Sequence, residues 1–96
     1  MKVTGWSNGK STYGIKVGRP NREAFFHRSL TRFVVEVDGI DDVHSPTDAF
    51  WSTCPELRSP AIRDWLRRQG PLPWAHRKPP RFTLVPLGEG RFRLEH

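Results

Sequence analysis

Turn-forming residues occur along the whole chain, and their spacing limits the length of any helix or strand. The sequence contains nine Pro and eight Gly residues in 96 positions. Pro fixes φ and lacks a backbone N–H donor, and Gly weakens helix and strand interiors, so both mark turns and element ends. The pattern therefore predicts short elements joined by many turns, and it argues against a bundle of long helices.

The length and the cysteine count restrict the protein class further. We expect residues 1–93 to form one domain with a single modest core. The final Leu94-Glu95-His96 is typical of the junction to a cloned affinity tag, so we expect no functional role for these residues. One cysteine, Cys54, excludes an intrachain disulfide framework and a cysteine-rich zinc site. No apolar run approaches the roughly 18 residues of a membrane span and no signal-peptide pattern opens the chain, so we expect a cytoplasmic protein.

Alternating apolar residues predict most of the strands. Tyr13, Ile15 and Val17 alternate with Gly14 and Lys16, which is typical of a half-buried strand. Residues 32–37 alternate in the same way, and the following Asp-Gly pair predicts a tight hairpin turn. The other predicted strands cover residues 2–4, 40–44, 82–85 and 91–94.

Two helices are expected. The second has the clearer signals: Ser59 caps it, Pro60 takes its first position and Gly70 ends it. Its core-facing side chains are Ile62, Trp65 and Leu66. The first helix begins at Pro20 or is capped by Asn21, and Phe26 and Leu30 share one of its faces. The segment 49–51 is a short apolar element whose period cannot be read. Prolines around Trp74 predict a stiff extended connection over residues 71–80.

The charges fall into three blocks. Residues 1–32 carry seven Lys or Arg and one acid, residues 33–57 carry six acids and no Lys or Arg, and the rest carries nine basic residues against three acids. This layout allows the two basic blocks to form one cationic face while the acidic block lies elsewhere. Such a face is typical of a protein that binds a polyanion, nucleic acid above all. An ordinary solvated surface with a high pI is the alternative.

The loop between the first two strands is the sharpest candidate site. It combines a cation, short hydrogen-bonding side chains and an aromatic ring, the residue types that contact phosphates and base edges. Lys10 would contact phosphate, and Asn8 would read an adenine edge or shape the turn. The alternative is a polar hairpin loop with Trp6 packed beneath it. The candidate residues of this loop are Trp6, Ser7, Asn8, Lys10, Ser11 and Thr12.

Two further basic groups are candidates for phosphate contacts. Arg58 and Arg63 belong to a set of arginines around the second helix, where a solvated helical face is the alternative. Arg77 and Lys78 lie among prolines, where they either contact phosphate or keep the connection soluble.

The sequence gives little support for catalysis. His27, His44 and His76 are scattered, and none lies at a spacing from Cys54 that suggests a nucleophile and its base. Four acidic residues between the helices could hold a divalent metal as in nucleases, but no lysine follows them, so an acidic turn-rich loop is the better interpretation. These residues are Asp41, Asp42, Asp48 and Glu56. We expect no catalytic residue, no metal and no cofactor.

The order of elements resembles a known DNA-binding family. Strand, loop, strand, helix, hairpin, short strand, helix and hairpin follow one another as in the DNA-binding pseudobarrel of plant auxin-response-type transcription factors and some restriction-endonuclease effector domains. The resemblance covers nearly the whole chain and rests on element order. It implies a small α+β fold, an open barrel of mainly antiparallel strands with a helix at each end. It also implies that two loop arms, residues 5–13 and 51–59, grip one DNA duplex.

The resemblance assigns roles in the second arm. Ser52 and Thr53 would donate to phosphates, and Arg58 would reach guanine. Together with the charge pattern this predicts non-catalytic binding of double-stranded DNA. The alternative is a protein-interaction or regulatory module whose basic face meets an acidic partner, and a metal-dependent nuclease is the third hypothesis.

Overall fold

The computed structural model describes residues 1–8, 12–53, 55–70, 74 and 79–96 of the chain. Within these residues the chain forms seven strands in one sheet, in the order β4-β3-β7-β6-β1-β2-β5, and three helices. All neighbouring strands are antiparallel except the parallel pair β3 and β7. The strands are β1 (Lys2–Ser7), β2 (Tyr13–Lys16), β3 (Phe33–Val37), β4 (Ile40–His44), β5 (Glu56–Leu57), β6 (Arg81–Gly88) and β7 (Arg91–Glu95).

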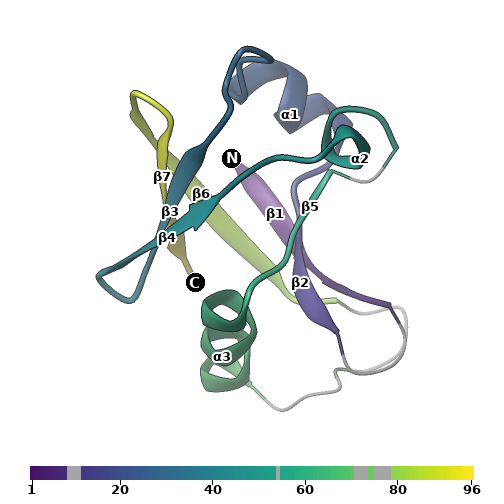
Figure 1. The fold of residues 1–96 in the computed structure, drawn as a ribbon. Coiled ribbons are helices and arrows are strands. Elements are labelled where there is room, and N and C mark those ends of the chain that lie inside the picture. The colour runs from purple at the N-terminus through teal and green to yellow at the C-terminus, as the bar shows by residue number, and fades with distance from the viewer. Residues whose placement is uncertain (9–11, 54, 71–73, 75–78) are drawn as a thin grey trace.

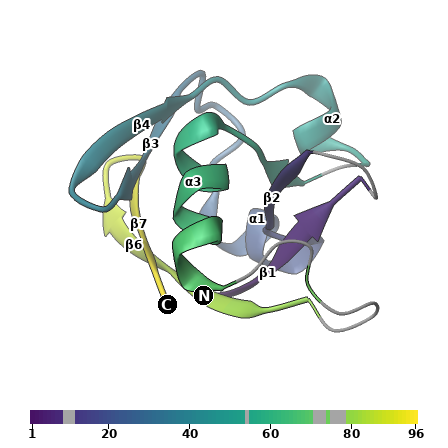
Figure 2. The same cartoon turned by 90° about the horizontal axis from the view of Figure 1, so that it is seen from below.

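The sheet curls into a half-barrel, and helices cover its two ends (Figures 1 and 2). Helices α1 (Arg19–Phe25) and α2 (Asp48–Trp51) lie at one end, and α3 (Pro60–Gln69) lies at the other (Figure 1). This arrangement confirms the predicted α+β fold, a small open barrel. No helix among the described residues has the length and apolar character needed to cross a bilayer.

The concave side of the sheet forms the core. Alternate residues of β3 point inward, and Phe33, Val35 and Val37 are each at most 2 % exposed, as the alternation predicted. The core is largely aromatic at the α1 end, where Phe26 stacks on Phe92 with ring centroids 4.4 Å apart. Ile62, Trp65 and Leu66 of α3 close the opposite end, where all three are buried.

The β3–β4 hairpin and helix α3 confirm their sequence signals. Asp38 and Gly39 both have positive φ, 52° and 77°, the backbone geometry of the predicted tight turn. The Ser59 hydroxyl accepts a hydrogen bond from the Ile62 N–H at 3.1 Å, so Ser59 is the N-cap of α3. Gly70 is its C-cap.

Helix α1 ends earlier than the sequence suggested. The backbone of Phe26 is already extended, with φ −115°, so Phe26 and Leu30 do not share a helical face and that prediction is wrong. Phe26 leaves the helix because its ring enters the aromatic core. Pro20 lies in the first turn, as expected, but Asn21 is not the cap. Its side-chain amide donates to the carbonyls of Lys2, at 2.7 Å, and Val17, at 3.0 Å.

Several elements differ in extent from the prediction. The apolar segment at 49–51 lies in helix α2, whose cap Thr47 accepts from the Phe50 N–H at 3.3 Å. β1 continues to Ser7, beyond the predicted residues 2–4, because its second half pairs with β2. β7 includes Leu94, which is 4 % exposed, and Glu95.

Candidate nucleic-acid interface

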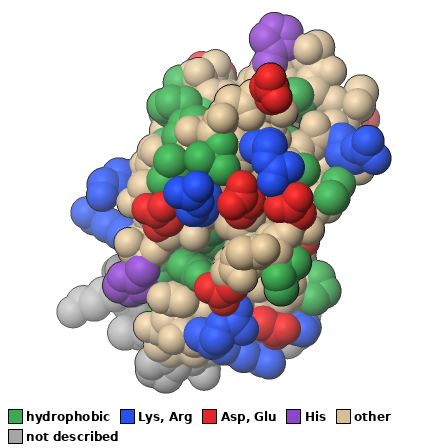
Figure 3. Space-filling view, turned by 90° about the vertical axis from the view of Figure 1, so that its left-hand side faces the viewer, with side chains coloured by type: hydrophobic (Ala, Val, Ile, Leu, Met, Phe, Trp, Pro, Cys, Tyr) green, Lys and Arg blue, Asp and Glu red, His purple; other side chains and the backbone are tan. Residues whose placement is uncertain are grey.

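Four of the six acids in the acidic block lie on the β3–β4 hairpin, and three of them, Glu36, Asp38 and Asp41, neutralise arginines of the C-terminal block. Arg91 donates to Asp41 at 2.8 Å and to Glu36 at 3.4 Å. These hydrogen bonds, the one to Asp41 first, raise the pKa of the Arg91 guanidinium. Arg93 lies 3.8 Å from Glu36, and Arg68 of α3 is hydrogen-bonded to Asp38. Acidic and basic side chains are consequently interspersed on this side of the molecule (Figure 3).

This pairing revises the expected division of charge. The acidic block does not lie apart from both basic blocks, because it neutralises arginines of the C-terminal one. The N-terminal block lies away from the hairpin acids, since β1 and β2 are separated from β3 by β7 and β6 in the sheet. Glu56, another member of the acidic block, is paired in register with Lys16 of the N-terminal block.

Basic side chains gather instead on the outward side of the four strands β6, β1, β2 and β5. Buried Val3, Ile15 and Phe82 point into the barrel, so their strand neighbours point outward. We call this surface the outer strand face, and its basic members are Lys2, Lys16, Arg58 and Arg81. Among the described residues no ion pair joins any of these four cations. An acidic side chain, Glu56, is present as the register partner of Lys16.

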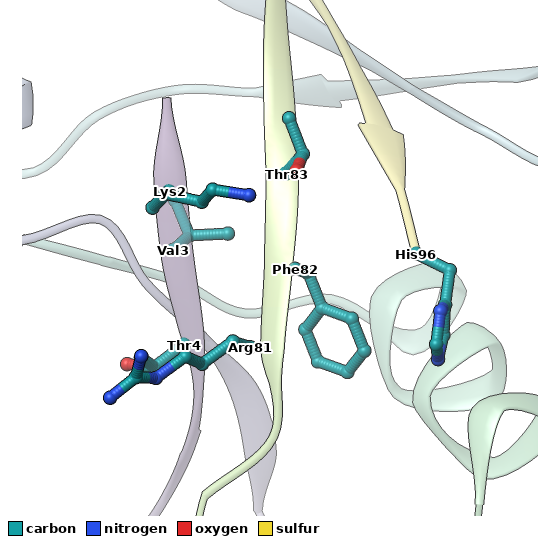
Figure 4. A pocket seen from close by; sticks show the side chains of 7 residues that line it. All are labelled: Lys2, Val3, Thr4, Arg81, Phe82, Thr83 and His96. Atoms are coloured by element: carbon teal, nitrogen blue, oxygen red, sulfur yellow. The ribbon is translucent and has the colours of Figure 1, made fainter.

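The β1–β6 part of this face is hollowed. Arg81 reaches from β6 across Thr4 of β1, and Lys2 points from β1 toward Thr83 of β6 (Figure 4). A hollow of about 420 Å³ is lined by these four residues together with Val3, Phe82 and His96. Two cations on neighbouring strands thus flank a depression that is lined partly by hydroxyl groups.

At the other side of the face, Arg58 is held against Trp6. The Arg58 guanidinium carbon lies 5.2 Å from the centre of the Trp6 ring, a cation–π arrangement. Gly14, the register partner of Trp6, lies between them on the outward side of β2. A Cβ atom at Gly14 would lie 2.9 Å from the Arg58 Cγ and 2.4 Å from the Leu57 carbonyl oxygen. The missing side chain therefore lets β5 approach β2 and lets Arg58 extend toward Trp6.

The structure brings some predicted site residues together and separates others. Trp6 and Arg58, one from each predicted arm, are in contact. Ser52 and Thr53 follow α2 at the end of the barrel opposite α3, and the Ser52 hydroxyl donates to the Asp48 carbonyl at 2.8 Å (Figure 1). Arg63 lies on α3, where its guanidinium is 3.4 Å from Asp64.

In the first arm, Asn8 shapes the chain locally. Its side-chain oxygen accepts from the Thr12 N–H at 3.3 Å, and its own N–H donates to the Thr12 carbonyl at 3.3 Å. Ser7 ends β1 and is half-buried. The predicted contacts at Lys10, Ser11, Arg77 and Lys78 lie outside the described residues, as do Cys54 and His76.

The sequence-based list of site residues omitted Lys2, Lys16 and Arg81. The signal that identifies all three is strand alternation, because each precedes or follows a buried apolar residue: Val3, Ile15 and Phe82. A cation next to a core residue in a strand must point to the opposite face.

A Ser–Asp–His cluster in the structure has the wrong connectivity for nucleophilic catalysis. The Asp42 carboxylate oxygen Oδ2 lies 2.7 Å from His44 Nε2 and accepts from the Ser59 hydroxyl at 2.6 Å. The aspartate is therefore in the middle, and no hydrogen bond joins the serine to the histidine that would have to act as its base. Within the described part of the chain, no three His, Cys, Asp or Glu residues are grouped so that they could hold a metal ion.

Comparison of the chain with protein-family models, with curated proteins and with solved structures finds no match.

Proposed function

We propose that this chain is a non-catalytic, cytoplasmic protein that binds double-stranded DNA through its outer strand face. The observation that carries the proposal is the pair formed by Arg58 and Trp6 across Gly14. Stacking on an aromatic ring restricts an arginine without using its N–H donors, so the guanidinium stays available for a phosphate or for the O6 and N7 atoms of guanine.

The surrounding cations support the same function. Lys2, Lys16 and Arg81 form no ion pair within the described residues, unlike Arg91 and Arg93 on the β7 side. Cations without carboxylate partners are the groups that can exchange their counterions for phosphates, which supplies most of the affinity of non-specific DNA binding. The hydroxyl groups of Thr4 and Thr83 in the hollow are further phosphate donors.

The order of elements supports the choice of duplex DNA. A seven-stranded open barrel with helices at both ends is the arrangement that the resemblance to the DNA-binding pseudobarrel implies. In that interpretation Trp6 belongs to the first arm and Arg58 to the second, and their contact makes one recognition surface of both.

Charge-matched variants test the proposal. We expect Arg58→Ala and Lys16→Gln each to weaken binding of a labelled duplex by about 1 kcal/mol or more, which corresponds to at least about fivefold. Arg93→Ala, which removes the same charge from an ion-paired site, is the control and is expected to change the affinity less than about twofold. Titration by fluorescence anisotropy at low salt measures all three.

The same titration separates the alternatives. Equal losses in all three variants would mean that binding depends on net charge and not on this face. Binding of an acidic polypeptide in the absence of any DNA binding would favour the protein-interaction module. Plasmid DNA incubated with the protein and magnesium is expected to stay intact, and cleavage would overturn the non-catalytic assignment.

A further inference from the structure

The end of the barrel where α1 and α2 meet carries a second hollow, of about 360 Å³. Its lining residues are Arg22, Glu23, Phe26, His27, Arg28 and Trp51. We propose that this hollow binds a nucleoside monophosphate, either as a free molecule or as the 5′-terminal nucleotide of a strand. The base would stack on Trp51 and the phosphate would contact the cations. This site is separate from the outer strand face and does not depend on the proposed duplex binding.

Arg22 supplies a buried positive charge, and its carboxylate neighbour in the hollow, Glu23, is mostly exposed. The residue is 8 % exposed, and its Nη1 donates to the carbonyls of Phe50 at 3.1 Å and Ser52 at 3.3 Å. Within the described residues its carboxylate neighbour is Glu23, 3.7 Å from Nη2, beyond hydrogen-bond distance and with a side chain 67 % exposed. A guanidinium has five N–H donors, and these contacts do not use them all. A guanidinium with unused donors at the wall of a hollow can bind an anion there.

His27 and Arg28 add donors at the rim. His27 Nδ1 contacts Ser29, at 2.6 Å from its hydroxyl and 3.2 Å from its backbone N–H, which leaves Nε2 as the ring nitrogen available to a phosphate oxygen. Arg28 is exposed, and the structure shows no ion pair for it within the described chain. Arg22, His27 and Arg28 all line this hollow, so one ligand can contact all three.

Trp51 supplies a planar surface beside these donors. Its ring is perpendicular to that of buried Phe50, with centroids 5.2 Å apart, which fixes its orientation. The Arg28 guanidinium carbon lies 5.8 Å from the Trp51 ring centre, near the limit of a cation–π contact. Base stacking on an aromatic side chain is stronger than an exposed cation–π pair, so a base can replace Arg28 on the ring and leave Arg28 to bind the phosphate.

Titration with adenosine 5′-monophosphate, adenosine and inorganic phosphate, followed by backbone amide NMR shifts, tests this site. We expect the monophosphate to bind saturably, with shifts in residues 22–28 and 50–52, and the other two probes to bind at least about tenfold more weakly. Arg28→Gln and Trp51→Leu should each weaken binding about tenfold, whereas Trp51→Phe should retain it within about threefold. Arg19→Gln, on the same helix but outside the hollow, is the matched control and should bind normally.

The test of the nucleotide site and the test of duplex binding can fail independently of each other. No saturable binding, or binding that Arg28→Gln leaves unchanged, overturns the site even if Trp51→Leu fails to fold. If a single strand with a 5′-phosphate binds more tightly than its 5′-hydroxyl counterpart, and Arg28→Gln removes the difference, the ligand is a strand end. Binding of the free monophosphate alone identifies a free nucleotide. Duplex binding is measured with blunt, 5′-hydroxyl DNA, so its failure does not affect this result.

Discussion

At the scale of single residues, Gly14 has the largest effect on the candidate interface. It is buried on β2, and its missing side chain is what allows the Leu57 carbonyl to approach. In the sequence Gly14 is one of eight glycines, and only the fold distinguishes it from those that merely form turns. Alternation predicted that Gly14 and Lys16 point outward, but it gave no sign that Arg58 would lie above Gly14, because that contact joins segments more than 40 positions apart.

Replacing Gly14 by Ala is expected to destabilise the protein by about 1–3 kcal/mol, because backbone and not a flexible side chain blocks the new methyl group. The expected loss is measured by chemical denaturation. Gly70→Ala is the control, since no atom of the described residues lies within 4 Å of a Cβ built there and its φ of 166° suits any residue. Equal stability of the two variants would contradict the close approach of β5 to β2.

At the scale of elements, local signals predicted those elements that local interactions determine. The caps of α3 and the Asp38-Gly39 turn act over a few residues, and both were found where the sequence indicated. The end of α1 was missed because tertiary packing of Phe26 against Phe92 decides it. Helix α2 was missed because four residues are too few for a readable period.

The cap of α3 is also a tertiary contact. The Ser59 hydroxyl accepts from the Ile62 N–H and donates to Asp42 on β4, so one group joins the helix to the edge strand. Aspartate is normally as good a cap as serine, but Ser59→Asp would place a second carboxylate beside Asp42. We therefore expect Ser59→Asp to destabilise the protein by about 1–2 kcal/mol, and Asp42→Asn to restore most of the loss.

The matched control is the other capped helix. Thr47→Asp at α2 has no such carboxylate among its hydrogen-bond partners, so it should change the free energy of unfolding by less than about 0.5 kcal/mol. Thermal and denaturant unfolding of the Ser59→Asp and Thr47→Asp variants measures the difference. If Ser59→Asp is as stable as the unmodified protein, the bond to Asp42 does not contribute to stability.

At the scale of the whole molecule, the fold sorts the charges into two unlike sides. Strand β7 carries arginines that acids of β3 and β4 neutralise, whereas β6, β1, β2 and the residue after β5 carry cations without described ion pairs. The sequence predicted a cationic face but not its composition, since strand order decides which basic block meets the acidic hairpin. With principal extents of 36 × 29 × 20 Å, the molecule is wider than the Debye length of about 8–10 Å at moderate salt.

The salt dependence of DNA binding should therefore reflect only the cations of the outer strand face. If Lys2, Lys16, Arg58 and Arg81 each neutralise one phosphate, the slope of log K against log salt is about −3.6, a loss on the order of a hundredfold between about 50 and 200 mM. A steeper slope would indicate further phosphate contacts, as predicted for Lys10, Arg77 and Lys78.

Variants on the two sides should change this slope differently. Arg81→Gln should reduce its magnitude by about one unit. The pair Glu36→Gln and Asp41→Asn, which releases Arg91 on the other side, should leave the slope unchanged within about half a unit, because the released charge is screened from a duplex on the outer strand face. Anisotropy titrations at four salt concentrations give both values. If releasing Arg91 steepens the slope by a full unit, DNA also contacts the β3–β4–β7 side, and the acidic hairpin acts to weaken a binding surface that extends around the barrel.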